Sequence, residues 1–417
     1  MKNLLYILLL FPVICWAQDS TATYTKRVLE TTEVEFLTSY YSQEGKNAAV
    51  TGGRGTEELT DFTPTIVVSI PLNDSDVLTI DAGISAYTSA SSSNVGPFDG
   101  AQPADPFVAS SGASGSDTWA NINGSYSHSS PDRNRIWGAH VSLATEYDYT
   151  SVGIGGNYTY LFNEKNTEVS LSGNVYLDQW KIIYPEEIRF ELENETDFDT
   201  LDGFADGARN SYSVGFGFSQ ILSKKAQFSL SLDLIQQKGL LSTPFHRIYF
   251  ADRPIFMAEN FPIAHDIERL PDTRFKVAIG GRFNYYLSET FVLRSYYRYY
   301  SDDFGITSNT ASLEIPIKIG GRFTLYPGYR YYQQSASAYF NGYAEALSTD
   351  EFYTSDFDLS EFNANQFSVG INYTDIFTGL KVFDFGLKSI DLKVSTYERN
   401  TGLNYFLISG GVKFVMD

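Results

Sequence analysis

Residues 274–340 read RFKVAIGGRFNYYLSETFVLRSYYRYYSDDFGITSNTASLEIPIKIGGRFTLYPGYRYYQQSASAYF and alternate apolar and polar side chains through four consecutive segments of strand length. In the first segment, the apolar side carries Phe275, Val277, Ile279, Phe283, Tyr285 and Leu287, and the polar side carries Arg274, Lys276, Arg282 and Asn284. This period of two predicts β-strands with two different faces. A soluble sandwich would bury the apolar face, whereas a membrane barrel would turn it toward lipid.

The N-terminus, MKNLLYILLLFPVICWAQ, has the pattern of a secretory signal peptide, with a lysine, an apolar run and small residues before Gln18. We expect residues 1–17 to be cleaved after Ala17 and residues 18–32 to form an N-terminal periplasmic segment. The single cysteine, Cys15, would leave with the signal peptide. Acylation of Cys15 fits poorly, because Val13 and Ile14 are bulky where a lipoprotein signal needs small residues. The mature chain would then hold no disulfide and no cysteine-ligated metal.

Composition limits the remaining classes. The formal net charge of −20 argues against a nucleic-acid partner, because a phosphate-binding surface is basic. Beyond the signal peptide, no apolar run approaches the roughly 20 residues that a spanning helix needs. Tyrosine and phenylalanine are abundant, at 30 and 31 residues, whereas helical periodicity is nearly absent. An exported chain of this kind is either a soluble β protein or a membrane barrel.

We predict a single all-β domain, residues 33–417, that forms a transmembrane antiparallel barrel of about sixteen strands, within a range of fourteen to eighteen. The predicted strands lie near 33–42, 60–72, 75–89, 116–129, 134–148, 151–163, 167–182, 209–222, 226–240, 273–287, 290–302, 307–319, 321–337, 361–375, 384–397 and 402–416. Short turns mostly alternate with the longer stretches 43–59, 90–115, 183–208, 241–272 and 338–360. The exceptions are three short connections near 149, 303 and 400 and a longer turn near 376–383. This alternation is typical of outer-membrane barrels, which have short periplasmic turns and long extracellular loops. A propeller or solenoid would show an internal repeat, and we find none.

The sequence also resembles a known family. The segments GTEELTDFTPTIVVSIPL (55–72), LTIDAGISAYTSASS (78–92), TEYDYTS (145–151), LSLDLIQQKGLLSTPFHRIYF (230–250), RLPDTRFKVAIGGRFNYYL (269–287) and YYRYYSDDFGITSNTASLE (296–314) resemble the outer-membrane proteins catalogued as domain of unknown function 3570. The resemblance runs from Glu33 to the C-terminus. It implies an outer-membrane barrel of a Gram-negative cell with no established activity. Such proteins are often encoded beside thioredoxin-like proteins and a flavin transferase, which hints at an envelope redox system.

A row of basic residues is the main candidate site, and it comprises Arg274, Lys276, Arg282, Arg294, Arg298, Arg322 and Arg330. Its alternation predicts that the row faces the lumen of the barrel. Guanidinium groups hold carboxylates and phosphates, so the row would attract anions. The alternative is an internal ion-pair network with Asp178, Asp233 and Glu314 that only fills a polar interior.

Two weaker candidates lie in the loops. Asp197, Asp199, Asp202 and Asp206 form an oxygen-rich cluster that could hold calcium, although it lacks the EF-hand register and also fits a solvated acidic loop. A second acidic stretch, Asp350 to Glu361, is interpreted in the same way. His246, one of four histidines, follows Pro244 in a loop that would fold into or over the barrel mouth, and a packed structural histidine is the alternative interpretation. No catalytic motif, cofactor site or metal-ligand spacing stands out, so we predict no enzyme, no cofactor and no metal site.

These observations predict an integral outer-membrane pore or transporter for small polar or anionic solutes. Its expected partners are outer-membrane lipid and the assembly machinery, which would read the final strand, residues 409–416. The alternative is a non-conducting scaffold that docks a surface or periplasmic partner, with an envelope redox or electron-transfer system as one setting. Loops 183–208 and 241–272 favour that alternative, because exposed apolar groups in loops mark contact surfaces. The second loop contains Phe245, Phe250, Phe256 and Phe261.

Overall fold

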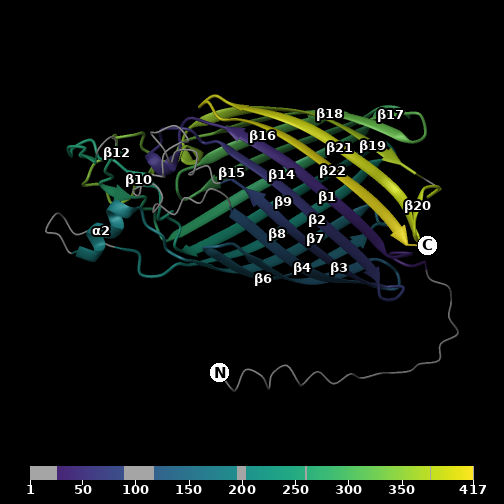
Figure 1. Ribbon diagram of the computed structural model, residues 1–417. Coiled ribbons are helices and arrows are strands. Elements are labelled where there is room, and N and C mark those ends of the chain that lie inside the picture. Colours follow the sequence, from purple (N-terminus) through teal and green to yellow (C-terminus); the bar gives the residue numbers. More distant parts are fainter. Residues whose placement is uncertain (1–25, 89–116, 195–202, 259–260, 376, 417) are drawn as a thin grey trace, which may run out of the picture.

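One antiparallel sheet closes on itself to form a barrel (Figure 1). The computed structural model describes residues 26–88, 117–194, 203–258, 261–375 and 377–416. The first strand, β1 (Glu33–Glu44), pairs with β2 on one side and with the last strand, β22 (Asn404–Met416), on the other. Because the first and last strands are each paired on both sides, their backbone groups are satisfied within the sheet.

The other wall strands are β2 (Leu59–Pro71), β3 (Asp76–Tyr87), β4 (Asp117–Ser129), β5 (Arg135–Thr145), β6 (Tyr149–Phe162), β7 (Thr167–Trp180), β8 (Ala208–Ser223), β9 (Ala226–Gly239), β14 (Thr273–Tyr286), β15 (Val292–Asp302), β16 (Thr307–Glu314), β17 (Ile317–Ile319), β18 (Phe323–Gln334), β19 (Phe362–Thr374), β20 (Lys381–Val382) and β21 (Phe385–Arg399). β16 and β17 both pair with β18 and form one strand interrupted at Pro316, which has no N–H to donate. β20 is a two-residue arm on β21. The described chain therefore forms a sixteen-stranded wall, and the prediction of an all-β barrel is confirmed.

The two faces of the wall differ in chemistry, as the alternation predicted. Directly opposed residues of antiparallel strands share a face. One register row therefore joins Phe36, Ile66, Ala82, Ile122, Leu143 and Val152 on the outward face. Phe36 and Ile122 each expose about half of their surface, at 50% and 48%. The inward rows carry glycine, serine, asparagine, tyrosine, arginine and acidic side chains.

A close contact across the interior shows why small residues occupy inward positions. The Tyr326 hydroxyl donates to both carboxylate oxygens of Asp391, at 2.6 Å each, although β19 lies between their strands. The tyrosine ring crosses Gly370, where an added Cβ would lie 2.1 Å from ring atoms. Only glycine at position 370 lets the ring reach Asp391.

The two ends of the barrel are built differently. At the end where β1 begins, hereafter the turn end, the connections are mostly short, and Arg27 pairs with Asp74 at 2.9 Å. The described part of the predicted periplasmic segment, residues 26–32, thus lies against a turn. The predicted signal peptide and the predicted loop 90–115 lie outside the described residues.

The opposite end, hereafter the loop end, carries a folded cap. We define the cap as the described residues of 45–58, 181–207, 240–272 and 335–361. Its elements are η2 (Ala49–Thr51), α2 (Glu186–Asn194), β10 (Arg247–Ile248), β11 (Met257–Ala258), β12 (Phe261–Pro262), β13 (Asp266–Ile267) and η4 (Phe357–Leu359). Figure 1 shows α2, β10 and β12 beyond the wall strands. No helix in the described part of the chain has the length and apolar character needed to cross a membrane.

The cap has two small hydrophobic cores. The first buries Ile188, Tyr249, Ala264 and Ile267, and the second buries Ile248, Phe250, Ala346 and Tyr353. Together they join segments that are far apart in the sequence. β10 pairs with β13, and an isolated bridge joins Phe250 to Ala346. Loop 240–272 therefore packs against the described parts of loops 181–207 and 335–361.

Candidate functional site

A buried arginine ties three cap segments together. Arg247 has no exposed side-chain surface. Its Nε donates to Glu187 Oε1 at 2.6 Å, and its Nη1 donates to the carbonyl oxygen of Val50 at 2.8 Å. A charge buried this deeply is tolerated only when it is paired and hydrogen-bonded, so this contact fixes η2, α2 and β10 against one another.

A second group of charged side chains joins loop 335–361 to loop 240–272 within the cap. The Tyr353 hydroxyl donates to Asp266 Oδ2 at 2.5 Å, and Arg269 Nε donates to the same oxygen at 2.9 Å. Arg269 and Tyr353 also form an isolated antiparallel bridge. These contacts attach loop 335–361 to the end of loop 240–272.

A cavity of about 490 Å³ lies where the cap meets the wall. The wall contributes Tyr41 from β1, Tyr397 and Arg399 from β21, and Tyr405 from β22, and the cap contributes Glu57, Phe245, His246, Asp356 and Asp358. Arg399 Nη1 donates to Asp358 Oδ1 at 2.7 Å, which links the top of β21 to η4. The cavity is therefore rich in ionisable groups from both parts of the molecule.

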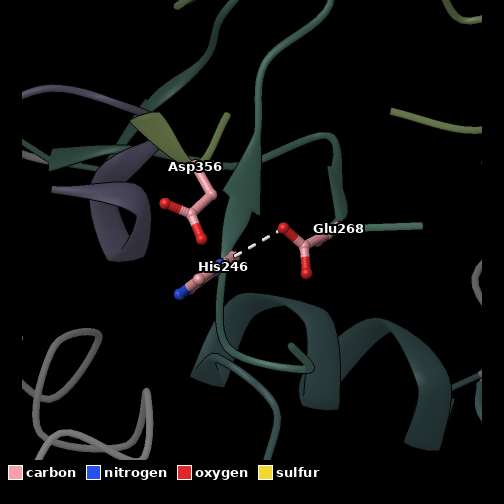
Figure 2. A group of neighbouring side chains, drawn as sticks. All are labelled: His246, Glu268 and Asp356. Atoms are coloured by element: carbon pink, nitrogen blue, oxygen red, sulfur yellow. Dashed lines mark hydrogen bonds and ion pairs between the residues drawn. The ribbon is translucent and has the colours of Figure 1, made fainter. Parts of the chain in front are cut away.

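Three of these ionisable groups converge at the edge of the cavity. Figure 2 shows the side chains of His246, Glu268 and Asp356 pointing toward one another. One ligand atom from each lies within 4.8 Å of the other two. His246 Nδ1 is 3.4 Å from Glu268 Oε2. Glu268 is almost fully buried, at 2% exposure, whereas His246 and Asp356 are half-buried.

The electrostatics of this cluster reflect an excess of acidic groups. Burial, followed by repulsion from Asp358, raises the pKa of Asp356 to about 7. Burial alone would lower the pKa of His246, but the neighbouring Glu268 raises it overall. Burial and Asp358 also raise the pKa of Glu57. The cavity and its edge therefore hold more acidic than basic groups. The carboxyl groups are those of Glu57, Glu268, Asp356 and Asp358, and the basic groups are Arg399 and His246.

The structure places most of the predicted basic row on one face of neighbouring strands. Arg274, Lys276 and Arg282 lie on β14, Arg294 and Arg298 on β15, and Arg330 on β18. Arg322 lies in the turn between β17 and β18. One register row runs from Arg298 through Thr310, Tyr332 and Ala364 to Arg399, and the next runs from Arg330 through Gln366 to Tyr397 and Tyr405. Two residues that line the cavity, Arg399 and Tyr397, therefore share register rows with Arg298 and Arg330.

The members of the row differ in their partners. Arg274 pairs with Asp302 at 2.5 Å, and Arg294 pairs with Glu314 at 3.0 Å. Arg282 lies over the Tyr296 ring, 4.9 Å from its centroid. Within the described ranges, the side chains of Lys276, Arg298, Arg322 and Arg330 make no hydrogen bond or ion pair. Of the acids in the alternative network, Glu314 joins the row, whereas Asp178 lies 3.8 Å from Arg209.

Comparison with known proteins places the chain in a family. A family model described as a protein of unknown function, DUF3570, matches residues 11–416. The chain belongs to this family. No curated protein sequence matches it.

Several solved structures are similar to this DUF3570 protein. A bacterial polysaccharide outer membrane secretin is 9% identical, with 93% of this chain and 99% of that chain covered and a TM-score of 0.45. The ferric enterobactin receptor PfeA of Pseudomonas aeruginosa is 11% identical, with 89% and 54% covered and a TM-score of 0.41. The TodX monoaromatic hydrocarbon channel is 10% identical, with 93% and 91% covered and a TM-score of 0.40.

Other candidate residues of this DUF3570 protein are more dispersed. Asp206 accepts from the Ala208 backbone N–H at 3.1 Å, whereas Asp197, Asp199 and Asp202 lie outside the described residues. His128 pairs with Asp76 at 2.5 Å near the turn end. His265 stacks on Phe250 with ring centroids 5.8 Å apart.

His246 and the stretch containing Asp356 were candidates from the sequence, whereas Glu268 was not. These residues come from positions far apart in the chain, and no short spacing joins them. What brings them together is the bridging of loop 240–272 to loop 335–361, and no sequence pattern indicates it. That bridging becomes visible only in the folded cap.

Proposed function

We propose that this protein is an outer-membrane channel for small polar or anionic solutes, and that its cap controls entry at the loop end. The closed wall supports a membrane location, because a closed barrel satisfies its backbone hydrogen bonds internally in lipid. The outward rows of apolar side chains support the same location. In this proposal the turn end is periplasmic, the cap lies outside the cell, and the assembly machinery reads β22.

The observation that carries the preference for anions is the group of unpaired cations on the inward face. Lys276, Arg298 and Arg330 lie on β14, β15 and β18, and they make no ion pair within the described chain. Cations that line a narrow aqueous path raise the local concentration of anions. Arginine also presents a planar set of donors that matches a carboxylate or phosphate. An anionic solute would therefore meet unsatisfied donors on its way through the barrel.

Planar-bilayer recording of the purified full-length protein tests this proposal. Under a salt gradient, we expect a reversal potential that indicates anion preference. Replacing the two inward arginines that make no ion pair in the described chain, Arg298→Gln together with Arg330→Gln, should move the reversal potential toward zero. The matched control is Arg135→Gln, because Arg135 is exposed and pairs with Tyr160 on the outward face. Absence of conductance would refute the channel, and an unchanged reversal potential in the double variant would refute the role of these arginines.

A second candidate function is a non-conducting scaffold that docks an envelope partner, with an electron-transfer system as one setting. It is favoured by the packed cap and by the exposed tip of loop 240–272. Phe256 and Met257 expose 68% and 57% of their surface at this tip. Purification in mild detergent distinguishes the two functions. A scaffold predicts a stoichiometric partner that is lost with Phe256→Ser, together with no conductance.

A further inference from the structure

The His246, Glu268 and Asp356 cluster has the geometry of a metal site that needs only small side-chain movements. A tetrahedral ion with ligands at roughly 2.0–2.2 Å separates neighbouring ligand atoms by about 3.3–3.6 Å. The His246 to Glu268 separation is already 3.4 Å. All three ligand atoms lie within 4.8 Å of one another, so a rotation of the Asp356 side chain would complete the set.

The mixture of ligands points to a class of ion. One imidazole nitrogen and two carboxylate oxygens suit borderline divalent ions such as Zn²⁺, whereas Ca²⁺ and Mg²⁺ prefer oxygen ligands alone. We propose that His246, Glu268 and Asp356 bind a divalent transition-metal ion, with Zn²⁺ as its representative, in the cap of this barrel.

The surroundings of Glu268 are those of a positioned ligand. Its Oε1 accepts from the Thr243 backbone N–H at 2.7 Å, and its Oε2 accepts from the Thr354 hydroxyl. The Asp356 N–H in turn donates to Thr354 Oγ1 at 3.0 Å. Thr354, which is completely buried, therefore orients two of the three ligands at once. Such hydrogen bonds around a site hold ligands in place and strengthen metal binding.

The cavity would give an ion access to the three ligands and would leave one coordination position of the ion open. His246 and Asp356 both line it, so an ion can enter from the cavity and keep one side open to it. Three protein ligands with an open fourth position form a common arrangement for Zn²⁺. Water or an oxygen of a passing solute would complete the coordination.

The ion would join two segments of the cap. His246 and Glu268 belong to loop 240–272, and Asp356 belongs to loop 335–361, so binding links the two described segments that carry the second hydrophobic core. An ordinary ion pair would need only His246 and Glu268. The pair of His128 and Asp76 at the turn end is of that simpler kind. Among the described residues, no second group of three such side chains comes as close together.

Metal binding to the purified full-length protein in detergent tests the proposal. After treatment with a chelator and dialysis, calorimetric titration with Zn²⁺ should show one ion per chain. His246→Ala and Asp356→Asn should each weaken binding by more than about 100-fold, since changes outside the ligand set alone cost roughly 10–100-fold. His128→Ala, which removes the simpler pair, should bind as the wild type does. Titration with Co²⁺ adds a visible absorption band that reports the ligand geometry directly.

Several results would overturn the proposal. They are absence of stoichiometric Zn²⁺ binding to the stripped wild type, unchanged binding in both ligand variants, and equal affinity for Mg²⁺. Asp356→Asn keeps the size of the side chain, and protection of the cap from trypsin shows whether the variant remains folded. The site is independent of conduction, because Zn²⁺ binding is measured without any solute. A barrel that conducts nothing would therefore leave this inference intact.

Discussion

In the wall, Ile279 faces outward with 48% of its surface exposed, whereas in the cap Ile267 is buried to 1%. Charged side chains are distributed in the opposite way. Arg330 on the wall is exposed on the inward face, and Arg247 in the cap is completely buried against Glu187. The wall thus has its apolar side outside, as suits a lipid solvent, and the cap has its apolar side inside, as suits water.

The two regions therefore fit different surroundings: the outward face of the wall fits lipid, and the surface of the cap fits water. The wall is stabilised by a continuous ladder of backbone hydrogen bonds, so single side chains have limited influence on its closure. The cap has short elements and two small cores, and its segments depend on a few buried polar contacts. Substitutions that disturb the cap should therefore leave the wall closed.

The largest effect is expected from Arg247→Ala. The change leaves Glu187 buried without its partner and frees the Val50 carbonyl. Removing one partner of a buried ion pair costs about 3–5 kcal/mol, which is comparable with the stability of so small a unit. Trypsin should then cleave within loop 240–272, while circular dichroism should still report an intact wall.

The control for that variant is Arg189→Ala on α2, the helix that carries Glu187, the partner of Arg247. Arg189 pairs with Glu186, but both side chains are substantially exposed, at 44% and 39%. We expect its cap to resist trypsin as the wild-type cap does. Loss of the wall signal in Arg247→Ala would contradict the separation of the two regions.

Breaking the wall requires a change on its outward face. Ile279→Arg places a charge near the middle of β14, where an arginine facing lipid costs about 2–4 kcal/mol. Folding into lipid vesicles, followed by urea titration, should show this loss. Ser231→Arg is the matched control, because Ser231 pairs with Gly280 on the inward face and its charge would meet water. Equal losses in the two variants would mean that the outward face is not in lipid.

The wall could be predicted from the sequence because its signal is local. A period of two assigns faces residue by residue, and it grouped Lys276 with Arg298 before the register was known. Pro316 divides its strand but does not disturb that alternation. The cap has no such local signal, because Arg247 contacts Glu187 and Val50 only once the long loops have folded together. The basic row shows the same limit, since alternation assigned its face but not which of its members would find partners.

A smaller effect is expected from Tyr353→Phe in the cap. The change removes the hydroxyl that donates to Asp266 but keeps the ring that packs on Phe250. A hydrogen bond to a charged group contributes about 1.5–3 kcal/mol, and Arg269 remains to pair with Asp266. Amide hydrogen exchange in β10 and β13 should become faster, and the increase should correspond to the Boltzmann factor of the free energy that is lost.

The control here is Tyr343→Phe. Tyr343 also packs in the cap, 4.7 Å from the Tyr249 ring, and its hydroxyl makes no hydrogen bond among the described residues. Its exchange rates should match those of the wild type. Faster exchange in this variant as well would mean that the rings, and not the hydrogen bond to Asp266, hold the segments together.

The smallest effect is expected from Arg294→Ala on the wall. Arg294 pairs with Glu314 as Arg247 pairs with Glu187, yet 57% of the Arg294 side chain is exposed to the lumen. Water screens such a pair, so its loss costs about 0–1 kcal/mol. Lys393 lies 3.8 Å from the same glutamate and would keep it partly neutralised. Urea titration in vesicles should therefore hardly distinguish this variant from the wild type, and a loss comparable with that of Arg247→Ala would show that the lumen around β15 is as dry as the cap.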